Sequence, residues 1–175
     1  ILLAPMLAAA RDACCDVHWS LYALNRFDAV GVGAASAPDT HQAPSSASLW
    51  LDAPWQAKLR AAAHRLHLLS NVSSDAEAAS RIRADAPHIL IDLNGLFSRG
   101  ARPLILAMRP SPIQATHLGY GASTGARFLD YVLADRFALS PTYRQATAYT
   151  ERFVLLTASH LPSGHASLYP SQGGD

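Results

Sequence analysis

The sequence predicts an α/β fold in which a mostly parallel β-sheet carries helices on both faces. Two observations support this prediction. From Pro54 onward, short apolar strands alternate with amphipathic segments of about ten residues, which is the pattern of consecutive β-α-β units. Some of these segments also begin with helix-capping residues, such as Ser74 and the pair Ser140-Pro141.

Bulk composition is consistent with one domain that has a real core. The chain has 175 residues, of which 50% are hydrophobic and 15% are charged. A chain of this length buries roughly 70% of its unfolded surface. The low charge content suggests surface intended for a partner or for a missing second half.

Net charge and cysteine content exclude several classes of protein. The net charge of +1 gives no basic footprint for nucleic acid, and no apolar run approaches the ~20 residues of a membrane span. The two cysteines, Cys14 and Cys15, are adjacent, and neighbours in sequence seldom form a disulfide. A reduced compartment is therefore expected, cytoplasmic and/or nuclear.

The first part of the chain is less regular than the rest. Residues 1–13 show helical apolar spacing, with Pro5 near a first turn or a kink. Residues 17–24 alternate as a strand does. Residues 28–48 are rich in Ala, Ser, Pro and Gly and have little to bury, so they are expected to form a surface loop or a disordered insert.

Strands and helices then follow in regular order. Strands are expected at residues 66–70, 88–95, 113–120, 131–135 and 151–157. Helices are expected at residues 55–65, 73–86, 101–109 and 140–149, with a short helical turn at 124–130. The expected organisation is one domain over residues 1–157 and an irregular tail over 158–175.

Ligands of parallel sheets bind beyond the carboxyl ends of the strands, and two unusual loops are predicted there. The first, LNGLFSRGAR, contains the turn pair Asn94-Gly95 close to Asp92. These residues either contact a ligand or form a polar cap on the strand end. Arg99, Arg102 and Arg109 could bind phosphate or carboxylate, or could simply be solvated.

The second loop, GYGASTG, follows His117. It contains Gly119, Tyr120, Gly121 and Thr124. It does not match GxGxxG, because Thr124 stands where the last glycine would be, and no Walker A lysine follows. The loop either lines a ligand site, where glycine permits close approach of the backbone, or is a tight turn.

Few other residues suggest chemistry. Of the eight histidines, His117 is the one predicted to lie where chemistry would occur, in a catalytic, binding or structural role. Asp130 and Asp135 flank the strand YVLAD, which is a plausible but unspecific place for a functional group. No HExxH motif or Cys/His metal-ligand spacing is present.

A family resemblance is carried by HILIDLNGLFSRGARPLILAMRPSPIQATHLGYGASTGARFLDYVLADRFALSP. The motifs DLNG, GAR, MRPSPIQ, LGY, TGA, LDY, AD and SP occur there in order, over about fifty residues. The segment resembles the catalytic region of protein O-linked N-acetylglucosamine (O-GlcNAc) transferases and the related SPINDLY-type proteins. With its flanks, the resemblance covers about 130 residues and identifies residues 1–157 as a partial N-terminal lobe.

The resemblance implies a two-lobed glycosyltransferase of the GT-B type with Rossmann-like lobes. Such an enzyme would transfer sugar from UDP-N-acetylglucosamine (UDP-GlcNAc) to Ser or Thr of acceptor proteins, with inversion and without a metal or cofactor. SPINDLY-type relatives would use GDP-fucose. The cleft of this chain would be lined by Asn94, Gly95, His117, Gly119, Tyr120, Gly121 and Thr124.

The chain also departs from the family pattern. Arg83 stands where a histidine is expected, Leu96 and Phe97 replace a polar pair, and Gly121 replaces a proline. The lysine and the His-Thr-Thr motif that hold the diphosphate belong to the second lobe, so no catalytic residue can be assigned in this chain. The 175 residues alone are therefore expected to be inactive, and a non-catalytic interaction domain is the alternative.

Overall fold

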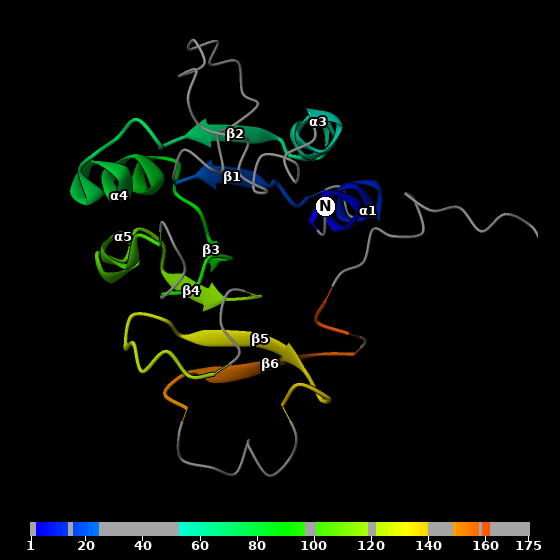
Figure 1. Ribbon diagram of the computed structural model, residues 1–175, viewed down its shortest axis with the longest axis vertical. Coiled ribbons are helices and arrows are strands. Elements are labelled where there is room, and N and C mark those ends of the chain that lie inside the picture. Colours follow the sequence, from blue (N-terminus) through cyan, green and yellow to red (C-terminus); the bar gives the residue numbers. More distant parts are fainter. Residues whose placement is uncertain are drawn as a thin grey trace, which may run out of the picture. The chain divides into compact units, whose positions relative to one another are not determined.

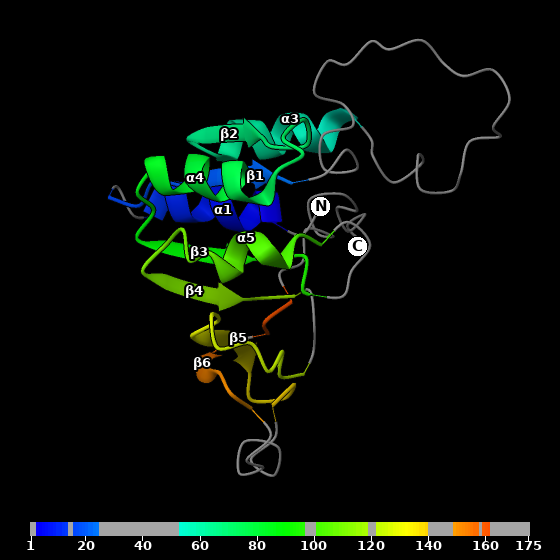
Figure 2. The same cartoon turned by 90° about the vertical axis from the view of Figure 1, so that its left-hand side faces the viewer.

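The computed structural model describes residues 3–13, 16–24, 53–96, 101–118, 122–139, 149–157 and 159–161. They divide into two compact units, one holding the described residues up to Asn71 and the other spanning Val72–Leu161. Both units combine helices with parallel strands, which confirms the predicted fold class (Figures 1 and 2). The expected insert at 28–48 and the helix expected at 140–149, apart from its last residue, lie outside the described residues.

The described residues of the first unit form two helices and a pair of parallel strands. Helix α1 (Leu3–Ala13) contacts helix α3 (Ala53–Ala62). Strand β1 (Ser20–Ala23) pairs with β2 (Arg65–Leu68). Strand β1 is shorter than the predicted 17–24, and the carbonyl of Trp19 just before it accepts hydrogen bonds from the backbone amides of residues 64 and 65.

The second unit is built on a four-stranded parallel sheet. Its strands are β3 (Ile89–Asp92), β4 (Ile113–Thr116), β5 (Tyr131–Asp135) and β6 (Arg152–Leu156). They lie side by side in chain order, β3-β4-β5-β6 (Figure 1). Since all four run in the same direction, their carboxyl ends share one edge of the sheet and their amino ends share the other.

Helix α4 (Asp75–Ala84) begins with the capping residues that the sequence predicts. The side chain of Ser74 accepts a hydrogen bond from the backbone N–H of Glu77 at 3.3 Å. Acidic residues occupy the first turn and arginines the last, as the helix dipole favours. The helix buries Ala78, Ala79 and Ile82.

Helix α5 (Pro103–Ala107) is the crossover between β3 and β4 and contacts α4 (Figure 2). It is shorter than the predicted 101–109. Pro103 begins it, and Arg102 before it donates a 2.7 Å hydrogen bond to the carboxylate of Asp75. That ion pair joins the first turn of α4 to the start of α5.

Two apolar clusters form the core of the second unit as described. Leu106, Ala126 and Leu129 form one, against which Leu96 and Phe128 pack. The other is formed by Val132, Ala134 and Leu139, with Tyr149 and Phe153 packed against it. The helical turn predicted at 124–130 is reduced to a turn at residues 127–128, closed by a bond from the Leu129 N–H to the Ala126 carbonyl.

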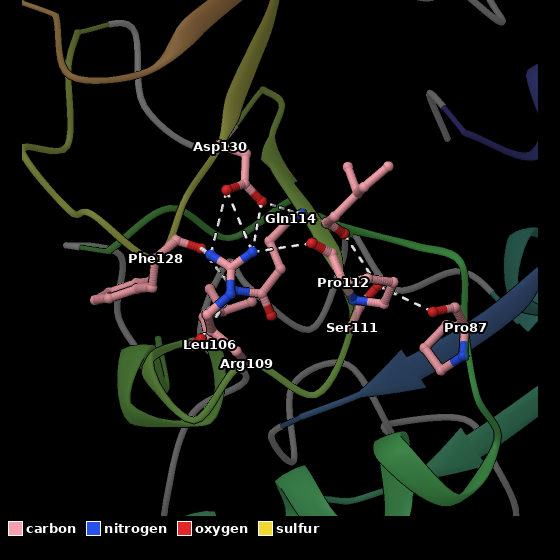
Figure 3. A network of polar contacts seen from close by, with 9 residues as sticks. Pro87, Leu106, Arg109, Ser111, Pro112, Gln114, Phe128 and Asp130 are labelled. Atoms are coloured by element: carbon pink, nitrogen blue, oxygen red, sulfur yellow. Dashed lines mark hydrogen bonds and ion pairs between the residues drawn. The ribbon is translucent and has the colours of Figure 1, made fainter.

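A polar network fixes the amino edge of the sheet (Figure 3). Gln114 is completely buried, and its Nε2 donates to the carbonyls of Leu106 at 2.8 Å and Phe128 at 2.7 Å. Asp130 accepts the backbone N–H of Gln114 at 2.9 Å and both terminal nitrogens of Arg109. The end of α5 and the starts of β4 and β5 are thereby tied together.

No helix among the described residues is both long enough and apolar enough to cross a membrane.

Candidate functional site

The carboxyl edge of the four-stranded sheet holds several of the polar residues considered for a site, among them Asp92, Asn94 and His117. Asp92 ends β3, and its Oδ1 accepts the backbone N–H of Asn94 at 3.1 Å. Gly95 follows with a left-handed φ of 68°, a conformation that favours glycine. The sequence DLNG therefore forms a turn that Asp92 itself caps.

Burial changes the chemistry of Asp92. Its side chain is buried, and desolvation raises the pKa of its carboxyl above the usual value, more than the amides of Asn94 and Gly95 lower it. The second oxygen, Oδ2, has no hydrogen-bond partner in the described part of the chain. The hydroxyl of Thr116, at the matching position of β4, is also buried and unpaired there.

Buried polar atoms without partners are rare in proteins, and these two lie on neighbouring strands at matching positions. Both atoms lie at the edge where ligands of parallel sheets bind. A carboxyl with a perturbed pKa in such a place is a functional-site candidate.

His117 follows Thr116 and is buried. Its backbone N–H donates to the Asp92 carbonyl at 2.8 Å, and its Nδ1 lies 3.2 Å from the carbonyl oxygen of Leu133. Burial lowers the pKa of His117 more than the Leu133 carbonyl raises it, which favours the neutral ring. With Nδ1–H donating to Leu133, Nε2 is left as the basic nitrogen.

Asp135, at the end of β5, holds a histidine that sequence reasoning missed. Its Oδ2 accepts both the backbone N–H and the ring Nδ1 of His160 at 2.7 Å each. Its Oδ1 accepts the backbone amides of Phe137 and Ala138. Those amides, with Ala138 contributing most, and the contacts from His160 hold the pKa of Asp135 well below its usual range. The rings of His160 and His117 are 6.3 Å apart.

The cavity at this edge is small. It has a volume of about 60 Å³ and is lined by residues that include His117, Leu118, Tyr149 and His160. That space holds a few water molecules rather than a nucleotide sugar, since small-molecule sites occupy roughly 300–1,000 Å³. The carboxyl edge thus offers polar groups of the kind a cleft needs, without forming a complete cleft in the second unit.

Not all of the predicted site residues meet at this edge. Asn94, Gly95 and His117 lie there. Thr124 lies beside the amino end of β6, where its backbone N–H donates to Glu151 at 2.7 Å. Gly119, Tyr120 and Gly121 lie outside the described residues.

Hydrogen bonds to Glu151 hold Thr124 at the amino edge of the sheet. The Oε1 of Glu151 accepts the hydroxyl of Thr124 and its Oε2 accepts the hydroxyl of Ser123 at 2.7 Å. Burial alone would raise the pKa of Glu151, but these hydrogen bonds outweigh it and lower the pKa. Ser123 and Thr124 therefore have a structural task at the amino edge.

The arginines considered as anion-binding forks are mostly used inside the fold. Arg102 pairs with Asp75, and Arg109 with Asp130. Arg83, where the family pattern has histidine, donates to the carbonyl of Met108 at 2.7 Å. Arg99 lies outside the described residues. Among the residues that the structure does describe, no three His, Cys, Asp or Glu side chains cluster as a metal site.

Comparison with known proteins gives consistent matches. The family model described as glycosyl transferase family 41 matches residues 51–172. The UDP-N-acetylglucosamine--peptide N-acetylglucosaminyltransferase of Caenorhabditis elegans is 39% identical over 100 residues, covering 57% of this chain and 8% of that protein. A probable enzyme of that name from Hordeum vulgare, SPINDLY, is 35% identical over 85 residues, covering 49% of this chain and 9% of that protein.

A solved structure is also similar. An O-GlcNAc transferase mutant of Thermobaculum terrenum superposes with a TM-score of 0.67 at 25% identity, covering 92% of this chain and 25% of that one. The chain thus spans about a tenth of the length of the curated relatives named above and a quarter of that solved structure.

Proposed function

Because the chain belongs to glycosyl transferase family 41, we propose that it forms most of the first lobe of a protein O-GlcNAc transferase. The family match over residues 51–172 is the observation that carries this proposal. The whole enzyme transfers N-acetylglucosamine from UDP-GlcNAc to Ser or Thr hydroxyls of acceptor proteins, without a metal, in the cytoplasm and/or the nucleus.

In this proposal the carboxyl edge of the sheet faces the cleft. Asn94, Gly95 and His117 contribute to it, with Asp92 and the Asp135–His160 pair beside them. The groups that stabilise the leaving diphosphate come from a second lobe. Stabilisation of developing charge usually contributes more to the rate than any other effect, so the 175 residues alone transfer no sugar.

N-acetylglucosamine is preferred over fucose as the transferred sugar. The match to the Caenorhabditis elegans enzyme is longer and more identical than the match to SPINDLY, 39% over 100 residues against 35% over 85. Transfer of fucose from GDP-fucose is the second candidate. A non-catalytic interaction domain is the third, favoured by Arg83, whose side chain is committed to the Met108 carbonyl.

The test begins with the native protein, purified from its source with an antibody against residues 109–131. It is incubated in parallel with labelled UDP-GlcNAc and labelled GDP-fucose, together with a mixture of acceptor proteins. Incorporation of N-acetylglucosamine into Ser or Thr supports the proposal, and incorporation of fucose alone replaces it with the second candidate. If neither sugar is transferred, the non-catalytic alternative stands.

Two further measurements complete the test: the mass of the purified native protein and the transfer activity of the recombinant chain. A native mass well above 18.7 kDa is expected, because the proposal requires a second lobe. The recombinant 175-residue chain should incorporate no label under the same conditions. Robust transfer by that chain would contradict the assignment of the diphosphate-binding groups to a second lobe.

A further inference from the structure

A cavity of the second unit lies at the edge of the sheet opposite to the candidate site. It has a volume of about 430 Å³ and opens at the amino ends of β4, β5 and β6. We call it the amino-edge pocket and define it by the residues that matter to the argument: Pro112, Ile113, Arg127, Leu129, Tyr131 and Arg152. Its volume falls within the roughly 300–1,000 Å³ of small-molecule sites.

The side chains of two arginines that line this pocket do not take part in the hydrogen bonds and ion pairs of the described residues. Arg127 and Arg152 are both exposed, and neither guanidinium donates a hydrogen bond or forms an ion pair within the described residues. They differ in this from Arg102 and Arg109, whose side chains hold the fold together. An arginine pair in a concave site is suited to a doubly charged anion, since each guanidinium can donate two parallel hydrogen bonds.

The carboxylate in the pocket wall does not neutralise this pair. Asp130 lines the pocket, but both of its oxygens bind Arg109, at 3.2 and 3.0 Å (Figure 3). Side-chain contact with Arg109 contributes most to lowering the pKa of Asp130, and the charge of Arg152 contributes least. Asp130 is therefore paired with Arg109, and the pocket lined by Arg127 and Arg152 keeps an excess of positive charge.

The remaining walls are suited to an organic group. Pro112 and Ile113 supply apolar surface, and Tyr131 lines the pocket beside them. Ile113 is 39% exposed although it is aliphatic and begins a strand. An inorganic ion would leave this surface uncovered, whereas an organic phosphate would cover it and gain from burial.

We propose that the amino-edge pocket binds a phosphate monoester carried on an organic group, through Arg127 and Arg152. The phosphate belongs either to a small molecule or to a phosphorylated side chain of a protein; the chemistry recognised is the same. The pocket lies at the opposite end of the strands from Asp92, His117 and Asp135, so the proposal is independent of sugar transfer.

The experiment is a titration of the isotopically labelled 175-residue chain, followed by amide NMR at low ionic strength. The probes are phenyl phosphate, a short phosphoserine peptide, and phenylacetate as a singly charged control. Both phosphates should shift the amides of Ile113, Tyr131 and Arg152 saturably. Phenylacetate should bind at least about tenfold more weakly, because it offers fewer acceptor oxygens and less charge. Whichever phosphate binds more tightly indicates the source of the natural ligand.

Variants locate the site. Arg127→Gln and Arg152→Gln should each weaken phenyl phosphate binding by about tenfold or more, the loss expected for one charge-assisted contact. Arg136→Gln is the matched control, because Arg136 is exposed at the carboxyl end of β5, next to Phe137. It removes the same charge and should leave the affinity unchanged.

The amide spectra also report whether each variant is folded. The proposal is overturned if no saturable shift occurs up to about 10 mM phenyl phosphate, a concentration above the range of useful small-molecule sites. It is equally overturned if Arg136→Gln weakens binding as much as Arg127→Gln and Arg152→Gln do, or if phenylacetate binds as well as the phosphates.

Discussion

Glu151 binds the backbone N–H of Thr124 at 2.7 Å, across 27 residues of the chain. The same carboxylate accepts the hydroxyls of Thr124 and Ser123, so one buried side chain in front of β6 holds the loop between β4 and β5. The composition of the loop GYGASTG suggested ligand binding. Its residues Ser123 and Thr124 are instead anchored to the amino end of β6.

Glu151→Gln should therefore destabilise the protein. The amide keeps one acceptor oxygen but places a donor against hydroxyls and loses the charge, so a loss of about 1–3 kcal/mol in the free energy of unfolding is expected. Urea denaturation measures it. The control is Glu77→Gln, which removes an exposed ion pair with Arg81 and one charge from the first turn of α4 and should cost less, about 0.5–1 kcal/mol. Equal effects of the two substitutions would contradict the anchoring role.

The effect of Glu151→Gln should also depend on pH. The pKa of Glu151 is lowered in the folded protein, so its stabilising contribution is present above the pKa of the unfolded chain and is lost as pH falls through the folded value. The difference in stability between the wild type and Glu151→Gln should accordingly shrink on acidification. A difference that is constant from neutral to acidic pH would be inconsistent with a bound carboxylate.

Gln114→Met tests the network at the amino edge. Methionine has a similar volume but no donor, so the carbonyls of Leu106 and Phe128 lose the amide of a fully buried side chain. Each carbonyl keeps a hydrogen bond from Arg109, through its backbone N–H to Leu106 and its Nη1 to Phe128, so the loss of the two Gln114 bonds should cost about 1–3 kcal/mol. The control, Ile113→Met, changes the exposed neighbour on the same strand and should cost less than about 1 kcal/mol. Thermal and urea unfolding would show whether this order holds.

Ser74→Ala tests the cap of α4. The substitution removes the oxygen that accepts the Glu77 N–H, and loss of such a cap costs about 1 kcal/mol. Ser80→Ala changes an exposed serine inside the same helix and should be neutral or slightly stabilising, because alanine has the higher helix propensity. A cap without energetic weight would make the two variants equally stable.

The pKa values of Asp92 and Asp135 should be shifted in opposite directions from the usual aspartate value. In a carbon-detected NMR titration, Asp92 should lose its proton above the usual aspartate range because it is buried, and Asp135 below it because of the hydrogen bonds it accepts. Asp135 then adds stability above its unfolded pKa, whereas ionising Asp92 costs stability as pH rises. If Asp92 and Asp135 titrate over the same pH range, the two carboxyl groups have similar surroundings and this prediction is wrong.

The order of strands and helices was predictable because each element carries its own local signal. Ser74 marks the start of α4, Pro103 marks the start of α5, and apolar residues mark the strands. Lengths were less predictable. The carbonyl of Trp19, just before β1, accepts hydrogen bonds from the amides of His64 and Arg65 at the start of β2, so the beginning of β1 is set by partners more than 40 residues away.

The candidate site was predictable only for residues that lie at the carboxyl end of a predicted strand or directly after it. Asp92, Asn94 and His117 were expected at the carboxyl edge and lie there. His160 was assigned to the irregular tail and set aside, since its segment is rich in Pro, Gly and Ser and nothing local connects it to Asp135. The position of Thr124 depends on Glu151, another distant partner, so its place at the amino edge could not be inferred from the loop composition.

The strand order β3-β4-β5-β6 has a consequence for how the protein is made. Each strand pairs with the strand synthesised just before it, so no strand of this sheet has to wait for a later one to find its place. Since contacts close in sequence form faster than distant ones, the sheet can grow strand by strand as the chain leaves the ribosome. Only the long-range anchors, such as Glu151 on Thr124, then remain to be added when β6 emerges.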